Sequence, residues 1–244
     1  MLILCSPYVK AAGKFTFSTG ATYITGDYGN SEKTEIYYVP FSFKYKIKKF
    51  QFKLSIPYIE KTGPENILID VGQTGQRVRT IRTTRTTESG LGDITAAIRY
   101  RLYYNPEHKI FINSGFKVKF GTADEGKGLG SGKTDYSFNL GFFKVINAFT
   151  PYAKVGYKLY GRKDLNDVFF ASLGLSYKIN SVISSGIKYS YRQKVSDRGV
   201  DKQQITAFSS QKLTKNWGLS EYINKGFGRS TSDWAGGLSI SYKF

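Results

Sequence analysis

The feature that most constrains the fold of this chain is a strict alternation of apolar and polar side chains. In the stretch KIFINSGFKVKF, for example, Ile110, Ile112, Phe116, Val118 and Phe120 all fall on one side of a period of two. This period is typical of a β-strand, whose successive side chains point to opposite faces. The pattern recurs along the chain, and nowhere does the 3.6-residue period of a helix compete with it. The sequence therefore predicts an all-β protein of about twelve strands.

The connections between these segments alternate in length. Short turns fall near 48–49, 105–107, 147–150, 180–181 and 215–216, and longer polar loops near 28–34, 62–91, 122–133, 161–167, 196–202 and 228–233. This alternation is typical of a transmembrane antiparallel up-and-down β-barrel, with short periplasmic turns and longer extracellular loops. The segments also match the about 9–11 residues that a tilted strand needs to cross a bilayer. We therefore predict such a barrel in the bacterial outer membrane.

Alternation alone leaves open which face is inside, so a soluble sandwich or barrel is the alternative. Three features favour an outward apolar face. Lys and Arg crowd the polar face, where a soluble core could not hold them unpaired. Tyr and Phe gather near strand ends, as aromatic girdles do. The ending GLSISYKF resembles the C-terminal signal by which the barrel-assembly machinery recognises outer-membrane barrels, and we assign that signal to Leu238, Ile240, Tyr242 and Phe244.

The N-terminal segment MLILCSPYVKA is apolar and then contains small residues. We interpret residues 1–11 as a residual or truncated signal peptide, although the charged n-region of such signals is missing, and an ordinary N-terminal tail is the alternative. Residues 12–244 form a single barrel domain in this interpretation. Cys5 is the one cysteine, which excludes an internal disulfide.

If the apolar face meets lipid, the polar face lines a lumen, and that face is basic in a chain of net charge +18. The cations that we place on the path of a solute are Lys44, Lys46, Arg99, Arg101, Lys117, Lys119, Lys154, Lys158, Lys188 and Arg192. Acids on these faces are few, Asp93 and Asp135 being the clearest, so we expect the mid-strand cations to be unpaired and solvated by water. About twelve strands leave a narrow pore, and a basic one favours anions.

The loop over 62–91 is the candidate plug of this pore. It contains QRVRTIRTTRTTE, with Arg77, Arg79, Arg82 and Arg85. These side chains can fold inward, or they can face lipopolysaccharide phosphates at the rim. Basic segments also occur in nucleic-acid-binding proteins, but the helix or aromatic platform expected of those is missing here. We therefore favour lipid or rim contacts for the four arginines.

The stretch GKGLGSGKT, residues 126–134, is similar to a phosphate-binding loop but lacks its spacing. Such a loop has four residues between its first Gly and the Gly-Lys-Ser/Thr ending. Here five residues separate Gly126 from Gly132, and three separate Gly128 from it. A phosphate-binding loop also leads into a helix, whereas both flanks here alternate as strands do. We predict a flexible loop between antiparallel strands.

No catalytic or metal-binding pattern is present in the sequence. His108 is the only histidine, and it lies in the NPEHK turn at the predicted periplasmic end. One histidine in that place excludes a Ser–His pair at the outer rim and a multi-histidine metal site. We therefore expect no enzymatic activity, no cofactor and no metal.

Three short glycine-containing motifs follow one another in the second half of the chain. They are Ser89-Gly90-Leu91-Gly92-Asp93 at the start of a strand, Gly128-Leu129-Gly130-Ser131-Gly132 with Asp135, and Tyr152 with Gly156-Tyr157. With these motifs the sequence from Ser89 onwards resembles the MetA-pathway phenol-degradation family of outer-membrane transporters. The resemblance implies a barrel of about twelve strands and passive uptake, linked by name to aromatic compounds. It implies no binding residues, and the family name does not predict a basic lumen.

These patterns together predict a monomeric, passive outer-membrane channel for small solutes. Its expected partners are outer-membrane lipid and lipopolysaccharide, the barrel-assembly machinery and a small solute, and not nucleic acid. The alternative is a closed or plugged barrel with a structural or lipopolysaccharide-binding role. Glu221 and Lys225 do not fit the pattern, because they fall on the apparent lipid face of their strand, and a bulge would re-aim them.

Overall fold

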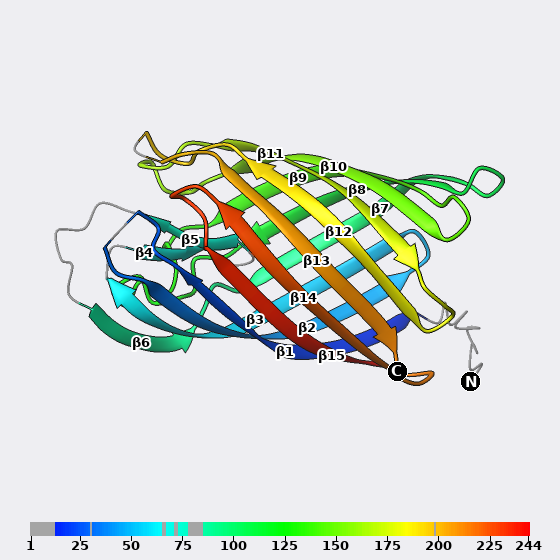
Figure 1. Cartoon of the computed structure of the whole chain (residues 1–244), viewed down its shortest axis with the longest axis horizontal. Helices are drawn as coiled ribbons and strands as arrows, with labels where there is room; N and C mark the ends of the chain where they lie inside the picture. The colour runs from blue at the N-terminus through cyan, green and yellow to red at the C-terminus, as the bar shows by residue number, and fades with distance from the viewer. Residues whose placement is uncertain (1–12, 30, 65–66, 71–72, 78–84, 198) are drawn as a thin grey trace, which may run out of the picture.

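The computed structural model describes residues 13–29, 31–64, 67–70, 73–77, 85–197 and 199–244, which form a barrel of antiparallel strands (Figure 1). The strands are β1 (Lys14–Gly26), β2 (Thr34–Ile47), β3 (Phe50–Pro64), β4 (Ile67–Asp70), β5 (Gln73–Arg77), β6 (Arg85–Leu91), β7 (Thr95–Asn105), β8 (Ile110–Lys119), β9 (Asp135–Lys144), β10 (Phe149–Leu159), β11 (Val168–Lys178), β12 (Ile183–Arg192), β13 (Lys202–Lys212), β14 (Trp217–Phe227) and β15 (Trp234–Lys243). In this part of the chain, no helix is long and apolar enough to cross a membrane. The segment 1–11, interpreted above as part of a signal peptide, lies outside the described residues.

The barrel wall is one closed sheet. Its strands follow the order β2-β1-β15-β14-β13-β12-β11-β10-β9-β8-β7-β3, and β3 pairs with β2 to close the ring. β3 pairs with β7 over Phe50–Ser55 and with β6 over Tyr58–Pro64, so β6 continues the line of β7 beyond an interruption at 92–94. Counted in this way, the described wall has twelve strands, and the prediction of an antiparallel barrel of that size is confirmed.

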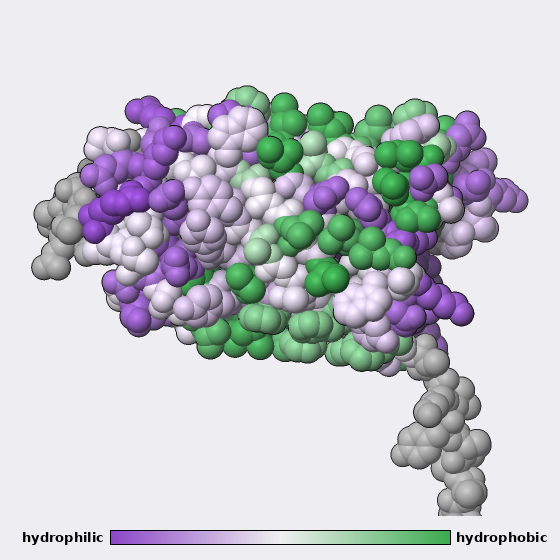
Figure 2. All heavy atoms as spheres, turned by 60° about the horizontal axis from the view of Figure 1, so that its bottom comes forward, coloured by the Kyte–Doolittle hydropathy of each residue, from purple (hydrophilic) through white to green (hydrophobic). Residues whose placement is uncertain are grey.

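Large apolar side chains cover the outside of the wall. Phe138, Leu140, Leu173 and Ile187 are each about half exposed, as are many others that alternate with polar or small residues. On the face that Figure 2 shows, hydrophobic side chains gather between two more hydrophilic ends of the barrel. A soluble sandwich would bury these side chains against a second sheet. The outward apolar face predicted from the sequence is therefore confirmed.

Aromatic rings gather at the end of the barrel that carries the short turns, where the C-terminus also lies (Figure 1). The ring centroids of Tyr104 and Phe111 are 4.7 Å apart. Across the closure between β1 and β15, the ring of Phe244 lies 5.5 Å from Phe15 and 4.9 Å from Tyr242. These contacts form part of the predicted aromatic girdle at this end. They also place the proposed assembly signal on the strand that closes the barrel, while its recognition by the assembly machinery stays a prediction.

Glu221 and Lys225 lie on the outer face of β14. The register of β14 with β13 and β15 runs through both residues without a shift, so the bulge that would re-aim them does not occur. The Lys225 ammonium is 4.7 Å from the centroid of the Trp234 ring near the long-loop end, where a lysine can reach the membrane surface. Glu221 is exposed beside Ser209, with the Gln211 amide nitrogen 3.5 Å from its carboxylate.

Candidate functional site

The connection between β8 and β9, residues 120–134, folds into the barrel, and we call it the inward loop. Its buried apolar side chains pack against the inner face of the wall in a cluster of Ala123, Leu129, Ile24, Ile36, Ile59 and Ala235. The last four belong to β1, β2, β3 and β15, and β15 is five places from β8 in the ring of twelve. Ile24 is in register with both Ile36 and Ala235, so the cluster continues along the wall from strand to strand. The loop therefore packs inside the barrel near the long-loop end and narrows the lumen there.

The sequence analysis named the 62–91 loop as the candidate plug and did not place the 120–134 connection inside the barrel. Residues 65–66, 71–72 and 78–84 of the 62–91 loop lie outside the described residues, so its role as a plug stays a prediction. In the described part of that loop, β6 pairs with β3 and extends the wall, and β4 pairs with β5 in a separate sheet. Arg85 holds the rim together, because its guanidinium lies 2.9 Å from the Glu35 carboxylate and donates to the Lys33 carbonyl at 2.8 Å. The other arginines predicted to contact lipid or the rim are Arg77, Arg79 and Arg82. Their side chains are not among those that the structure describes.

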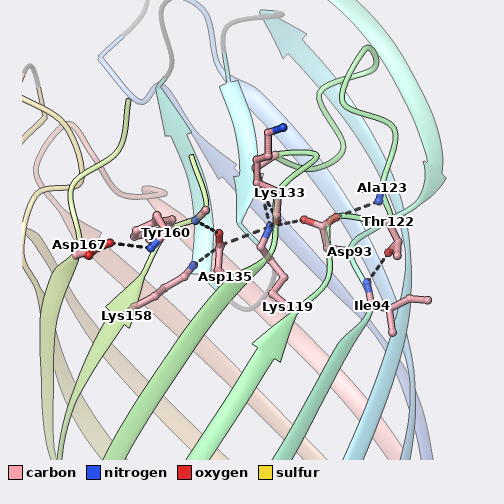
Figure 3. A network of polar contacts seen from close by, with 12 residues as sticks. Asp93, Ile94, Lys119, Thr122, Ala123, Lys133, Asp135, Lys158, Tyr160 and Asp167 are labelled. Carbon is pink, nitrogen blue, oxygen red and sulfur yellow. Dashed lines mark hydrogen bonds and ion pairs between the residues drawn. The ribbon is translucent and has the colours of Figure 1, made fainter. Parts of the chain in front are cut away.

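A buried charge network fixes the inward loop (Figure 3). Its centre is Lys119, the last residue of β8, whose ammonium lies 2.7 Å from Asp93 and 3.4 Å from Asp135. The same ammonium donates to the Ser131 hydroxyl at 2.7 Å and to the Lys133 carbonyl at 3.1 Å, both in the loop. The other carboxylate oxygen of Asp93 accepts the N–H of Ala123 at 3.0 Å. Asp93 and Lys119 thus hold both ends of the inward loop.

The network continues across β9 to β10. Asp135, the first residue of β9, lies 3.2 Å from the Lys158 ammonium and accepts the Gly161 N–H at 3.1 Å. The Lys158 ammonium also lies 4.0 Å from the centroid of the Tyr160 ring. All four charged side chains are nearly inaccessible to solvent. The expectation of unpaired charge is therefore wrong for Lys119 and Lys158, because the two acids noted on these faces neutralise them.

The glycines of the inward loop let it approach Asp93. A Cβ atom on Gly130 would lie 2.7 Å from both carboxylate oxygens of Asp93 and 2.6 Å from the Cβ of Ala123. Gly128 and Gly132 have φ values of 65° and 62°, which glycine adopts without strain. The stretch GKGLGSGKT therefore lies between two antiparallel strands, as predicted, and no helix follows it. The prediction of a flexible loop did not foresee that its glycines allow close packing inside the barrel.

Below the inward loop, the lumen wall contains a basic cavity of about 190 Å³. Its cationic lining residues come from β3, β7, β8 and β10: Lys53, Arg99, Lys117, Lys154 and Lys158. The described lining residues include no acid, although Asp135 lies directly behind Lys158. Lys53, Arg99 and Lys154 form no ion pair among the described residues. Phe170, Gln51 and Asn139 complete its polar and aromatic lining. The structure thus gathers four of the predicted lumen cations in one place.

Lys53 belongs to this cavity but was missed in the sequence analysis. It alternates with Phe52 and Leu54 on a strand whose apolar row was recognised, so the same period of two could have placed it in the lumen.

The other predicted lumen cations lie elsewhere on the wall. Lys44 pairs in register with Lys53 on the neighbouring strand. The Arg101 guanidinium carbon lies 5.7 Å from the centroid of the Tyr104 ring near the short turns, and Arg192 is buried with its guanidinium donating to the Tyr160 hydroxyl at 3.2 Å. Two more lie outside the cavity lining: Lys46 and Lys188.

The β10–β11 loop packs over the same end of the barrel. Its Arg162 lies 3.5 Å from Glu125 of the inward loop and 2.8 Å from Asp164. The hydrogen bond and charge of Arg162 hold the pKa of the Asp164 carboxyl below its usual value, so both side chains are charged at neutral pH. Among the described residues, no group of three or more His, Cys, Asp or Glu side chains is placed to hold a metal ion.

Comparison with known proteins adds a family and a fold. A family model described as "Putative MetA-pathway of phenol degradation" matches residues 65–244. The COG4313 outer membrane channel from Pseudomonas putida F1 has a similar structure, with a TM-score of 0.72, 12% identity, and coverage of 98% of this chain and 99% of that chain. The NanC porin gives a TM-score of 0.61 at 11% identity, covering 93% of this chain and 100% of its own. Comparison with curated proteins finds no match.

Proposed function

The chain belongs to the MetA-pathway of phenol degradation family, and we propose that it is a passive outer-membrane channel for small solutes that favours anions. A closed barrel with an apolar belt outside and a polar interior pairs every strand edge while its outer face meets lipid. The observation that carries the preference for anions is the basic cavity. Five cations from four strands meet there, and no described lining residue is acidic.

The magnitude of this preference follows from Lys53, Arg99 and Lys154, which form no ion pair among the described residues. A unit charge 4 Å from one of them interacts by about 1 kcal/mol in bulk water and by about 4 kcal/mol at an effective dielectric of 20. Even the lower figure separates an anion from a cation by about 2 kcal/mol, or about thirty-fold in occupancy before screening. Salt reduces this difference, since the Debye length is about 10 Å at 0.1 M. We therefore expect a several-fold preference for chloride over potassium.

A barrel of the same fold gives the proposal indirect support. One solved structure is described as the KdgM porin in complex with disordered oligogalacturonate, and it matches this chain with a TM-score of 0.54 at 10% identity. Oligogalacturonate carries carboxylates, so that barrel accepts an anionic ligand. The similarity to that porin concerns the fold alone, and the proposed solute of the present chain rests on the lining of its own cavity.

The test is the reversal potential of the purified channel in a planar bilayer with a KCl gradient. Wild-type protein should show chloride preference. The double variant Arg99→Gln, Lys154→Gln should reduce this preference because it removes two cations that form no ion pair among the described residues. Lys163→Gln is the matched control, since Lys163 is exposed in the β10–β11 loop. Potassium preference in the wild type, or equal selectivity in the double variant and the control, contradicts the proposal.

The inward loop favours one second candidate, a closed barrel with a structural or lipopolysaccharide-binding role. The loop packs inside the barrel near the long-loop end and narrows the lumen there. Passage of any ion through purified protein separates the candidates, because a closed barrel shows no steady current. In either case we propose a monomer in contact with outer-membrane lipid, lipopolysaccharide and the assembly machinery, without cofactor, metal or enzymatic activity.

A further inference from the structure

The basic cavity has a shape as well as a charge. Its lining includes small residues on neighbouring strands, namely Ala97 on β7, Gly115 on β8 and Ser137 on β9. Lys117 pairs in register with both Ala97 and Ser137, so a cation lies between these two small residues. Small side chains and cations thus alternate in this part of the lining.

On one side of the cavity, the ring of Phe170 lies against the backbone of a glycine. A Cβ atom on Gly156 would lie 2.3 Å from the Cζ of Phe170, so the ring occupies the space that a side chain would take. Gly156 and Phe170 are opposite each other in the register of β10 and β11. The Lys154 ammonium lies 5.6 Å from the centroid of the same ring. The apolar surface of Phe170 therefore lies next to the Lys154 ammonium. This ammonium forms no ion pair among the described residues.

The volume limits what the cavity can hold. An apolar protein cavity of about 150 Å³ accepts one benzene molecule, and this cavity measures about 190 Å³. One six-membered ring with a single small substituent fits this space.

We propose that the cavity binds a small aromatic carboxylate, with its carboxylate at Lys154 and Arg99 and its ring against Phe170. The inference rests on the proposed function, because the solute reaches the cavity from the lumen. A neutral aromatic compound would displace water from the cations without replacing its hydrogen bonds, which costs binding energy. A small aliphatic anion would satisfy the charge but leave the ring surface uncovered. The combination of cation and ring selects a ligand that has both groups.

The probes are benzoate, cyclohexanecarboxylate, acetate and phenol, each titrated as a blocker of the chloride current of the wild-type channel. Cyclohexanecarboxylate matches benzoate in charge and approximate size but cannot stack. We expect benzoate to block at a concentration about two- to ten-fold lower than cyclohexanecarboxylate, from the extra energy of ring pairs. Acetate and phenol should be weaker still, because each supplies one of the two groups.

Variants locate the site. Phe170→Leu should abolish the advantage of benzoate over cyclohexanecarboxylate. Phe208→Leu is the matched control, because the Phe208 ring also covers a glycine, Gly186, but does not line the cavity. It should keep the advantage. Lys154→Gln should weaken block by all three carboxylates and leave phenol unaffected.

The outcomes distinguish this inference from the proposed function. If wild-type protein prefers chloride but responds to benzoate and cyclohexanecarboxylate equally, the aromatic site is refuted while the channel stands. If Phe208→Leu removes the advantage as fully as Phe170→Leu does, the site lies elsewhere and the assignment is wrong. If the barrel conducts nothing, titration calorimetry of the detergent-solubilised protein with the same four compounds tests the site directly. The order of affinities stated above supports it, and absence of benzoate binding overturns it.

Discussion

The charge network around the inward loop predicts that one substitution can release the loop without unfolding the barrel. Asp93→Asn keeps the shape of the side chain but removes the charge that lies 2.7 Å from the Lys119 ammonium. Removing one partner of a buried ion pair costs about 3–5 kcal/mol, and we expect the lower end because Asp135 also lies 3.4 Å from that ammonium. Burial of Leu129, the largest buried apolar side chain of the loop, stabilises the packed position of the loop by only about 1.5–3 kcal/mol.

The loop should therefore leave the lumen in a large fraction of Asp93→Asn molecules, since 3 kcal/mol is about a 150-fold change in an equilibrium. The barrel itself should persist, because the paired wall strands are unchanged. Two measurements report this. Single-channel conductance should rise, and trypsin should cleave after Lys127 faster than in the wild type, because a released loop reaches the protease more readily than one packed in the lumen.

Asp124→Asn is the control, because Asp124 is exposed in the same loop and accepts only backbone N–H groups of its own loop. The double variant Asp93→Asn, Lys119→Met removes both charges and should restore low conductance, since an apolar side chain of similar volume leaves no uncompensated charge. Conductance and cleavage equal in Asp93→Asn and Asp124→Asn would show that the network does not hold the loop.

Three further predictions concern the inward loop, the C-terminal strand and the lipid face. Gly130→Ala should loosen the inward loop, because its Cβ would lie 2.7 Å from the Asp93 carboxylate; faster tryptic cleavage checks this, and an unchanged rate contradicts it. Replacing Tyr242 and Phe244 with Ser should reduce the amount of heat-modifiable barrel in the outer membrane without changing synthesis, and undiminished assembly refutes the signal. Glu221→Leu should raise the free energy of unfolding in lipid vesicles by about 1 kcal/mol, because it removes a carboxylate from the lipid face; a fall in urea resistance would instead indicate a stabilising polar contact.

The fold could be predicted from the sequence because the bilayer imposes one rule on every strand. A side chain such as Leu173 meets hydrocarbon while its neighbours face the lumen, so a period of two appears wherever a strand crosses. The interruption at 92–94 was invisible to this rule. Asp93 looks like a polar lumen residue of an ordinary strand, and only the pairing of β3 with both β6 and β7 shows that the wall strand is broken there.

The inward loop could not be placed from the sequence, because loops carry no period and their contacts are distant. Leu129 belongs to the same buried cluster as Ile36 of β2, and nothing near either residue in the sequence indicates the other. A single leucine within a polar, glycine-rich loop was the one available signal. The pairing of Lys119 with Asp135 was within reach, because these residues end β8 and begin β9 and are opposite each other in register. The period of two was applied to each strand by itself, so it did not indicate that the two charges face each other, and the lysine was predicted to be unpaired.

We propose that the positions of the charges give two regions of the lumen different roles. At the inward loop, Asp93 and Asp135 balance Lys119 and Lys158, so in this proposal a region close to neutral limits the size of a solute. In the cavity, Arg99 and Lys154 form no ion pair among the described residues, so in this proposal they determine which sign of charge is favoured. The two properties should therefore change independently. Asp93→Asn should raise conductance while chloride preference remains, and the double variant Arg99→Gln, Lys154→Gln should lower the preference while the loop stays protected from trypsin. If either variant changed both properties together, the loop and the cavity would act as one constriction, and the assignment of separate roles would fail.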